Sequence, residues 1–506
     1  MVHGSHWDNP VSRSREARPA WIATIEATRG PRYQAIIQGV RAALLSGALK
    51  VGDRLPPQRA LARMLRLNLG TVTRAFDELR EAGLIKGEVG RGTYLTQLGG
   101  ADGPPSLWDH SHSLGYTDLS HNFPDQVPTH PAIDSILPEL VQVESAGRLL
   151  AVQADAGHPE HRAVAARWLS GMGLRATPEN VTITTGAQHG LLLALGALTQ
   201  PGDIVLTEEL TFYGLKSAAA MLGRSLLGVR MDSQGLAPDS LDLACQRSRA
   251  KVLFCCPTLH NPTTATMSVE RRREIVEICR RHDVTIVEDD VYALMLDELL
   301  PPLATMAPER TVYVTGLSKL FGPGLRIGFI AAPSPFSYSM GVALRATTLM
   351  ASPLNSDAAC RILTSSSLPS IVSAIRNETR ERQAIVSECL PSSAYVMHPG
   401  AFYFGLRMQG NWTAEGFARA AESIGVGVTP YTMFETMPLQ TAAMVRVCHN
   451  AAPSRENLRQ ALLSLAELRT AASNQRSVAS VTSQPAPRSA SSALSQPSAP
   501  VGRLGL

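Results

Sequence analysis

The sequence TVYVTGLSKLFGPGLRIG occupies residues 311–328 and indicates both the fold class and a reactive lysine. Its first five residues form an apolar run typical of a buried strand, so Lys319 lies just beyond a strand end. Ligands of open α/β sheets bind at the carboxyl ends of strands. Arg326 follows seven residues later, and a buried lysine beside a fixed arginine suits an aldehyde cofactor that bears a phosphate. Taken alone, a lysine after a serine is usually solvated, so this interpretation depends on the rest of the chain.

The surrounding residues 118–468 alternate apolar strands with helices. This alternation predicts an α/β domain with a mainly parallel sheet. The expected strands are 181–185, 204–207, 252–256, 285–288 and 311–315. The clearest expected helices are 187–198 and 268–282.

Two other strand ends carry groups that suit such a cofactor. Gly186, Ala187 and Gln188 follow one strand and open a helix, which leaves backbone N–H groups free for a phosphate. Asp289 ends a buried strand, and a carboxylate there would keep a pyridine nitrogen protonated. The protonated ring would then act as an electron sink.

Three further side chains are candidates for contacts with the ring. Tyr292 is placed to hydrogen-bond a ring hydroxyl, and Asn261 could reach the same oxygen. Phe212 could stack on the ring face.

The first fifth of the chain differs in charge from the rest. Residues 1–95 contain 15 Lys and Arg against 8 Asp and Glu, a net charge of +7, whereas the remaining 411 residues carry −3. This surplus indicates an anionic partner for the N-terminal part. A solvated arginine-rich face is the alternative.

Residues 31–96 have the pattern of three helices followed by a β-hairpin wing. In a helix–turn–helix the second helix lies in the major groove, and a wing can follow the DNA backbone. A protein-interaction module of three helices is the alternative. The residues expected to contact DNA are Arg54, Arg59, Thr71, Thr73, Arg74, Arg91 and Thr93.

This N-terminal unit closely resembles the winged helix–turn–helix of GntR-type transcription regulators. One departure is Leu69, because the family often has arginine at this start of the recognition helix. The residues that carry the resemblance include Gly52-Asp53-Arg54-Leu55-Pro56, Arg59-x-Leu61-Ala62, Thr71-Val72-x-Arg74-Ala75, Gly83-Leu84-Ile85 and Gly90-x-Gly92-Thr93.

Residues 118–468 resemble the fold-type I pyridoxal-phosphate aminotransferases. The resemblance implies that Lys319 forms the Schiff base, that Asp289 partners the pyridine nitrogen and that Arg326 binds the phosphate. It also implies that Arg446 grips a substrate α-carboxylate. The motifs in family order are Gly186-Ala187-Gln188, Pro201-Gly202-Asp203, the Glu208 segment, Asn261-Pro262-Thr263, Glu288-Asp289, Ser318-Lys319 with Arg326, and Val445-Arg446-Val447.

The chain departs from the aminotransferase pattern at three places. Thr264 replaces the usual glycine after Asn-Pro-Thr, and Phe212 stands where many relatives have tyrosine. Gly316 stands where many have a phosphate-binding serine or threonine. Ser318 or Thr315 is expected to supply that hydroxyl instead.

Together the two units resemble the MocR subfamily of bacterial regulators, so the expected fold is multi-domain. The resemblance implies pyridoxal 5'-phosphate as cofactor, a double-stranded DNA operator and a head-to-tail homodimer. It also implies that an amino compound forms an aldimine in place of Lys319 and thereby changes DNA binding. Family members respond to γ-aminobutyrate, taurine or pyridoxal phosphate, and Gly214 argues against γ-aminobutyrate here.

Two other functions use the same residues. The first is a working aminotransferase that carries a DNA-binding domain, which would turn over with a 2-oxo acid. The second is a DNA-binding dimer whose cofactor is purely structural.

Composition narrows the remaining classes. No apolar run reaches the ~18 residues needed to span a bilayer, and the N-terminus lacks a secretory signal, so a cytoplasmic protein without a membrane partner is expected. The seven cysteines include no CxxC pair, so no metal site is expected. Residues 1–30, 97–117 and 469–506 read as an irregular extension, a linker and a disordered tail.

Overall fold

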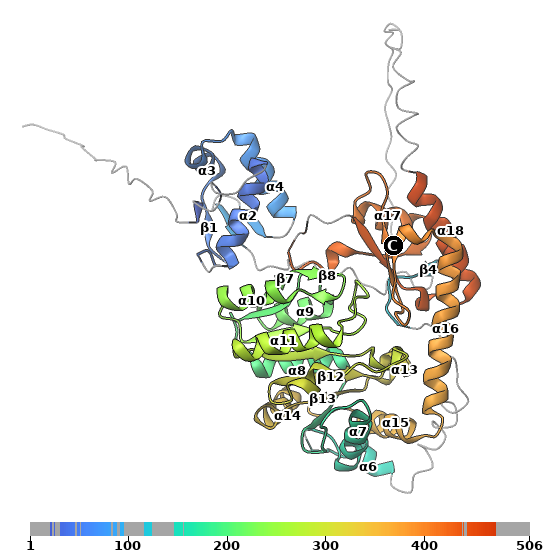
Figure 1. Cartoon of the computed structure of the whole chain (residues 1–506). Helices are drawn as coiled ribbons and strands as arrows, with labels where there is room; N and C mark the ends of the chain where they lie inside the picture. The colour runs from blue at the N-terminus through green and yellow to red at the C-terminus, as the bar shows by residue number, and fades with distance from the viewer. Residues whose placement is uncertain are drawn as a thin grey trace, which may run out of the picture.

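The computed structural model describes residues 21–22, 25, 31–45, 48–50, 52–81, 84–88, 92–95, 116–123, 146–154, 156–437, 439 and 443–471. The expectations for Arg91, for most of the linker and for the tail beyond residue 471 lie outside these residues. Figure 1 shows an N-terminal unit in blue, a central sheet with its helices in green and yellow, and a C-terminal lobe in orange and red.

The N-terminal unit contains the expected three helices and the wing. Its three strands form an antiparallel sheet in the order β1-β3-β2. Val72, Ala75, Phe76 and Leu79 are fully buried along one face of the third helix, as their helical spacing predicts. The elements are α2 (Arg32–Leu45), β1 (Arg54–Leu55), α3 (Gln58–Leu65), α4 (Leu69–Glu81), β2 (Ile85–Glu88) and β3 (Gly92–Leu95).

The core of this unit also includes Trp21, Ile22 and Ile25, which the sequence assigned to an irregular extension. A Cβ atom at Gly39 would lie 2.1 Å from Cγ1 of Ile25, so α2 packs closely against this segment. These three side chains therefore belong to the packed unit.

The central domain is built on a seven-stranded sheet in the order β5-β13-β12-β11-β10-β6-β7. β13 is antiparallel to both of its neighbours, and every other pair in this sheet is parallel. The parallel strands therefore end at one common edge. The strands are β5 (Val181–Thr184), β6 (Ile204–Glu208), β7 (Ser225–Val229), β10 (Val252–Cys255), β11 (Thr285–Asp289), β12 (Thr311–Gly316) and β13 (Gly328–Ala331).

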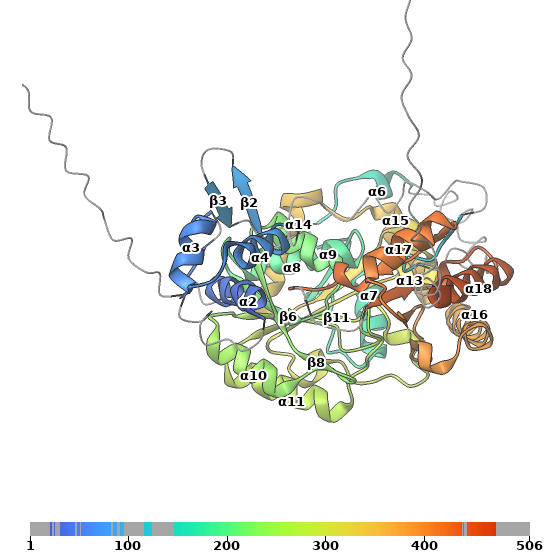
Figure 2. The same ribbon diagram turned by 90° about the horizontal axis from the view of Figure 1, so that it is seen from above.

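Helices cover both faces of this sheet, and each face has its own apolar core. Figure 2 shows α8 and α9 on one side of the strands and α10 and α11 on the other. The first group comprises α8 (Ala187–Leu198), α9 (Tyr213–Met221) and α14 (Ser334–Thr348). The second group comprises α10 (Pro238–Arg247), α11 (Val269–Arg281) and α12 (Leu303–Met306).

The C-terminal lobe is a four-stranded antiparallel sheet packed against helices. Its strand order is β14-β15-β18-β17, and α16 runs alongside this lobe from the region of α15 (Figure 1). The last helix ends at Ala471, three residues beyond the boundary expected from sequence. The elements are α16 (Leu368–Cys389), β14 (Tyr395–Val396), β15 (Phe404–Arg407), α17 (Ala414–Ser423), β17 (Thr429–Pro430), β18 (Met444–Val447) and α18 (Arg455–Ala471).

A short segment at the start of the effector part also joins the C-terminal lobe. β4 (Thr117–Asp118) pairs in parallel with β16 (Val426–Gly427). Leu119 follows and is fully buried in the core of this lobe.

Within the described residues, no single helix has both the length and the apolar character needed to cross a membrane. Helix α15 (Pro353–Thr364) passes this test only jointly with α16, across a bend of 88°.

Candidate functional site

The carboxyl edge of the central sheet borders a cavity of about 110 Å³. Strands β5, β11 and β12 end there, so residues far apart in sequence converge on it. Of the ten residues predicted to bear the reactive amine or hold a cofactor, nine line the cavity. They are Ala187, Gln188, Phe212, Asn261, Asp289, Tyr292, Ser318, Lys319 and Arg326.

Lys319 lies in the short helix α13 (Ser318–Phe321), directly after β12. Its side chain is buried, and this burial lowers the pKa of Lys319 to about 7. The Nζ atom donates a hydrogen bond to the backbone carbonyl of Asn122 and lies 4.4 Å from the ring centroid of Phe123. A large share of this lysine is therefore neutral near pH 7, which is the form that attacks an aldehyde.

Asp289 is the last residue of β11, and its buried Oδ1 atom has no hydrogen-bond partner among the residues that the structure describes. Burial, reinforced by the neighbouring Asp290 carboxylate, raises the pKa of Asp289 to about 7. A buried acceptor without a partner costs free energy unless a ligand supplies a donor. A protonated ring nitrogen is such a donor, so this residue fits a pyridine cofactor.

The two acidic neighbours of Asp289 each accept hydrogen bonds from other parts of the protein. Glu288 accepts hydrogen bonds of 2.9 Å from the backbone N–H groups of Leu303 and Ala304, at the start of α12. Asp290 accepts one of 3.1 Å from the hydroxyl of Tyr313, while its Oδ1 atom has no hydrogen-bond partner among the described residues. Of the three carboxylates, only that of Asp289 lines the cavity.

The start of α8 forms a compact cradle next to Arg326. Gly186 precedes the helix with φ of 83°, and a Cβ atom there would lie 2.9 Å from Nη2 of Arg326. The same Nη2 donates a hydrogen bond of 3.1 Å to the carbonyl of Thr185. Free N–H groups in the first helical turn and a guanidinium make a site that suits a phosphate.

The cradle also explains the departure at Gly316. A Cβ atom at this position would lie 3.1 Å from both the backbone nitrogen and the Cβ of Ala187. A side chain here would require Ala187 to shift by a few tenths of an ångström, and Ser318 is the hydroxyl residue that lines the cavity.

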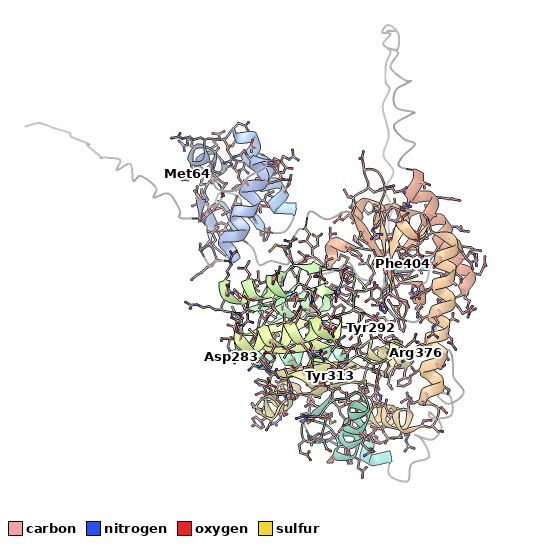
Figure 3. All side chains as sticks on the ribbon, viewed as in Figure 1. Met64, Asp283, Tyr292, Tyr313, Arg376 and Phe404 are labelled. Carbon is pink, nitrogen blue, oxygen red and sulfur yellow. The ribbon has the colours of Figure 1, made fainter. Side chains whose placement is uncertain are left out.

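The hydroxyl of Tyr292 lies in the cavity wall and accepts a hydrogen bond from Nδ2 of Asn122. Figure 3 labels Tyr292 between the central sheet and the lobe that contains Phe404. Asn261 also lines the cavity, but its Oδ1 accepts a hydrogen bond of 2.8 Å from Nη1 of Arg446. Contacts of Tyr292, Asn261 and Phe212 with a ring stay predictions.

Arg446 projects from β18 of the C-terminal lobe and is fully buried. Its Nη2 donates to the carbonyl of Ser120 at 2.6 Å, and its Nε has no hydrogen-bond partner. No carboxylate lies within ion-pair distance of it among the residues that the structure describes. A buried cation without a counter-ion is costly, so an anionic group of a ligand suits this position.

Sequence reasoning missed Asn122 and Phe123, which both line the cavity. The hydrogen bond between Lys319 and Asn122 joins residues 197 positions apart. Only their position at the start of the effector part, next to the linker, could have drawn attention to them.

The predicted DNA-binding residues lie on the N-terminal unit, and several contact one another. Arg74 forms an ion pair of 3.2 Å with Glu78 and lies 3.9 Å above the ring centroid of Tyr33. Thr73 donates a hydrogen bond of 3.0 Å to Gln58. These contacts position the side chains of Thr73 and Arg74 on the face of α4 that points away from the apolar core.

The remaining described candidates surround that helix. Asn68 caps α4 by accepting hydrogen bonds from the N–H and the hydroxyl of Thr71 at 2.8 and 2.7 Å. Arg59 is exposed on α3, and Arg54 packs across the backbone of the wing next to Thr93. Exposed arginines beside a helix of this kind suit phosphate contacts.

No group of three or more His, Cys, Asp or Glu side chains in the described part of the chain is placed to hold a metal ion.

Comparisons with known proteins give the same two units. Residues 115–465 match the family model of class I and II aminotransferases, and residues 32–95 match the model of bacterial regulatory proteins of the gntR family. Aminotransferases of this class depend on pyridoxal phosphate.

Two relatives match this chain over most of their own length. The chain is 26% identical over 459 residues to the HTH-type transcriptional regulator YdeF of Bacillus subtilis, which covers 91% of this chain and 99% of YdeF. It is 30% identical over 356 residues to the HTH-type transcriptional regulator TauR of Rhodobacter capsulatus, covering 64% and 72% of the two chains.

Among solved structures, an archaeal alanine:glyoxylate aminotransferase superposes with a TM-score of 0.66 at 25% identity, covering 71% of this chain and 92% of that one. The aminotransferase match spans more than half of the chain, and the match to gntR-family regulators precedes it in the sequence. The chain therefore belongs to the class I and II aminotransferase family and, because it also carries the gntR-type domain, to the MocR subfamily of GntR-type transcription regulators.

Proposed function

We propose that this protein is a pyridoxal-phosphate-dependent transcription regulator that senses an amino compound at Lys319. One observation carries the proposal: Lys319 lines the cavity, Arg446 is fully buried behind the cavity-lining Asn261, to which it donates a hydrogen bond, and neither cation has a carboxylate partner among the described residues. The amine of Lys319 suits an aldehyde, and the guanidinium of Arg446 suits an acid group of a ligand. An amino acid or aminosulfonate would satisfy both.

Asp289, Arg326 and the start of α8 would hold the cofactor. When bound, pyridoxal phosphate supplies an aldehyde carbon for an amine and a ring that withdraws electrons. Lys319 would supply the amine that reacts with this carbon, because burial lowers its pKa to about 7. Asp289 would keep a proton on the ring nitrogen, and Arg326 would neutralise the phosphate.

An incoming amine would compete with Lys319 and leave this side chain free. Arg446 would orient the same molecule through its acid group. Regulation is then a coupling free energy between the amine site and the DNA site, and it acts in both directions.

We place the DNA-binding domain, called the reader from here on, at residues 31–96 and the effector domain at residues 118–468. Arg54, Arg59, Thr71, Thr73, Arg74, Arg91 and Thr93 would contact a double-stranded DNA operator. A DNA-binding regulator of this family acts in the bacterial cytoplasm, and no membrane partner is needed.

We further propose a homodimer with a head-to-tail arrangement. Leu150, the last residue of helix α6 (Ala146–Leu150), and Val152, which follows the helix, are 81% and 75% exposed. Leu349 and Leu354, which flank the start of α15, are 48% and 42% exposed. Exposed apolar groups of this kind support a protein partner, and a second copy is the simplest.

The competing function is a working aminotransferase that carries a DNA reader. The cavity suits this function equally well, because Lys319, Asp289 and Arg446 would serve a regulator and an enzyme alike. Multiple turnover with a 2-oxo acid acceptor distinguishes it.

The test is a titration of the purified full-length protein with L-alanine, γ-aminobutyrate and taurine in the presence of DNA from upstream of its own gene. Visible absorbance reports the cofactor, and fluorescence anisotropy reports DNA binding at fixed salt. We expect one amine to change both signals together. If absorbance changes and turns over with an oxo acid while DNA affinity stays constant, the protein is an enzyme.

A further inference from the structure

Residues 116–123, here called the strap, begin at the end of the linker expected from the sequence, and Asn122 and Phe123 at their far end line the cavity. The first half of the strap is fixed to the C-terminal lobe through β4. The N–H groups of Thr117 and Leu119 donate to the carbonyls of Gly425 and Gly427 at 2.8 and 2.9 Å. This half therefore moves with the C-terminal lobe.

The second half of the strap is fixed to the central domain at the reactive lysine. Asn122 is 6% exposed, and its Nδ2 donates to the hydroxyl of Tyr292. Its backbone carbonyl accepts a hydrogen bond from Lys319. The strap therefore joins the two parts of the effector domain across the cavity.

Arg446 also donates to the strap. Its Nη2 lies 2.6 Å from the carbonyl of Ser120, which additionally accepts from the Thr429 hydroxyl at 3.2 Å. The carbonyls of Ser120 and Asn122 thus receive hydrogen bonds from the two side chains that an amino acid would engage. A ligand that engages Lys319 or Arg446 therefore alters the hydrogen bonds that hold the strap.

We propose that Asn122 is a positioning residue and that the strap carries the state of Lys319 to the reader. The Asn122 side chain, anchored on Tyr292, holds the strap carbonyl over Lys319. A free Lys319 amine then fastens the strap, whereas an engaged one leaves that carbonyl without its donor. Because residue 116 continues directly into the linker, the strap is the covalent route from the cavity to the DNA-binding unit.

The fastening of the strap by Lys319 stands without the proposed function, whereas its effect on DNA rests on it. Hydrogen–deuterium exchange of the full-length protein without cofactor tests the fastening. We expect the amides of Thr117 and Leu119 to exchange about five-fold faster in Asn122→Ala and in Lys319→Ala, the factor expected for one lost hydrogen bond. Wild-type rates in either variant overturn the proposal.

The exposed Asn377→Ala is the matched control, because Asn377 accepts a hydrogen bond only on the surface of α16. It should leave the strap at wild-type rates. Amides of β12 serve as an internal reference, and they should stay protected in every variant. This reference separates a loosened strap from a variant that fails to fold.

The second arm measures operator affinity with and without the amine that acts on the wild type. Asn122→Ala should bring the ratio of these affinities close to one while the cofactor absorbance still responds to the amine. A ratio equal to that of the wild type overturns transmission through the strap. If the wild type itself shows no amine effect on DNA, the proposed function fails, and the exchange rates still decide whether Lys319 fastens the strap.

Discussion

The recognition helix α4 and the effector cavity place their arginines in opposite surroundings. The side chain of Arg74 is 63% exposed and already paired with Glu78, whereas Arg446 is fully buried and has no carboxylate partner in the part of the chain that the structure describes. An exposed pair is worth little and rearranges easily, so the reader can exchange Glu78 for a phosphate at small cost. A buried unpaired cation has already lost its water, so its partner must come from a ligand. We therefore expect DNA binding by the reader to weaken gradually as the salt concentration rises. In the cavity we expect a sharp selection between ligands that carry an acid group and ligands that do not.

The largest effect is expected for Lys319→Ala. This change removes the buried amine, so the visible absorbance of bound cofactor and the amine dependence of operator affinity should both be lost. Operator affinity without amine should equal that of the wild type. Absorbance spectra and anisotropy check this, with the exposed Lys251→Ala as control. A Lys319→Ala protein that still responds to the amine would contradict the account.

Arg446→Ala should weaken binding of an acid-bearing amine by about 2 to 5 kcal/mol, or at least about 30-fold, because one partner of a buried charge pair is lost. Ethylamine, which has no acid group, should bind both proteins equally. Spectral titration measures both affinities, and the exposed Arg459→Ala is the control. Equal losses for L-alanine and ethylamine would mean that Arg446 acts through the fold.

The rate at which the cofactor-free protein captures pyridoxal phosphate should depend on pH through Lys319. Below its pKa of about 7 the amine is protonated and unreactive, so the rate should fall about tenfold per pH unit. Above that pKa the rate should level off. Stopped-flow absorbance measures this profile. A rate that still rises between about pH 8 and pH 10 would assign Lys319 an ordinary pKa.

Arg59→Ala should weaken operator binding uniformly and reduce the slope of log affinity against log salt by about one unit, as expected for one lost phosphate contact. The free energy of unfolding should change by less than about 0.5 kcal/mol because the side chain is exposed. Anisotropy across a salt series and urea unfolding check both values. An unchanged salt slope would remove Arg59 from the interface.

The smallest effect is expected for Glu78→Gln, which frees Arg74 from its surface ion pair. Such pairs are worth about 0.3–0.5 kcal/mol, so operator affinity should rise about two-fold. Arg74→Ala provides the opposing change and should weaken binding. If Glu78→Gln also weakens binding, Glu78 contacts DNA or orients the helix.

The sequence predicted the central sheet well, because its strands are short apolar runs that end in polar residues. Lys319 and Asp289 could be placed in one cavity from this pattern alone, since parallel strands end at one edge. The family comparisons confirm the predicted fold class and the two kinds of unit.

The sequence did not reveal contacts that depend on distant packing. Asn122 meets Lys319 and Tyr292 only after the strap crosses between two lobes, and no local pattern encodes that crossing. Trp21 and Ile22 were placed in an irregular extension because the surrounding residues are polar. Their burial becomes visible only when α2 is packed against them.

The central claim is that the amine site and the operator site are coupled, and such coupling is reciprocal. The most direct test is the midpoint of the amine titration, followed by cofactor absorbance, with and without saturating operator DNA. Reciprocal coupling predicts that operator DNA shifts this midpoint by the same factor by which the amine shifts operator affinity. A midpoint that is identical with and without DNA would contradict it and leave an aminotransferase joined to an independent DNA-binding unit.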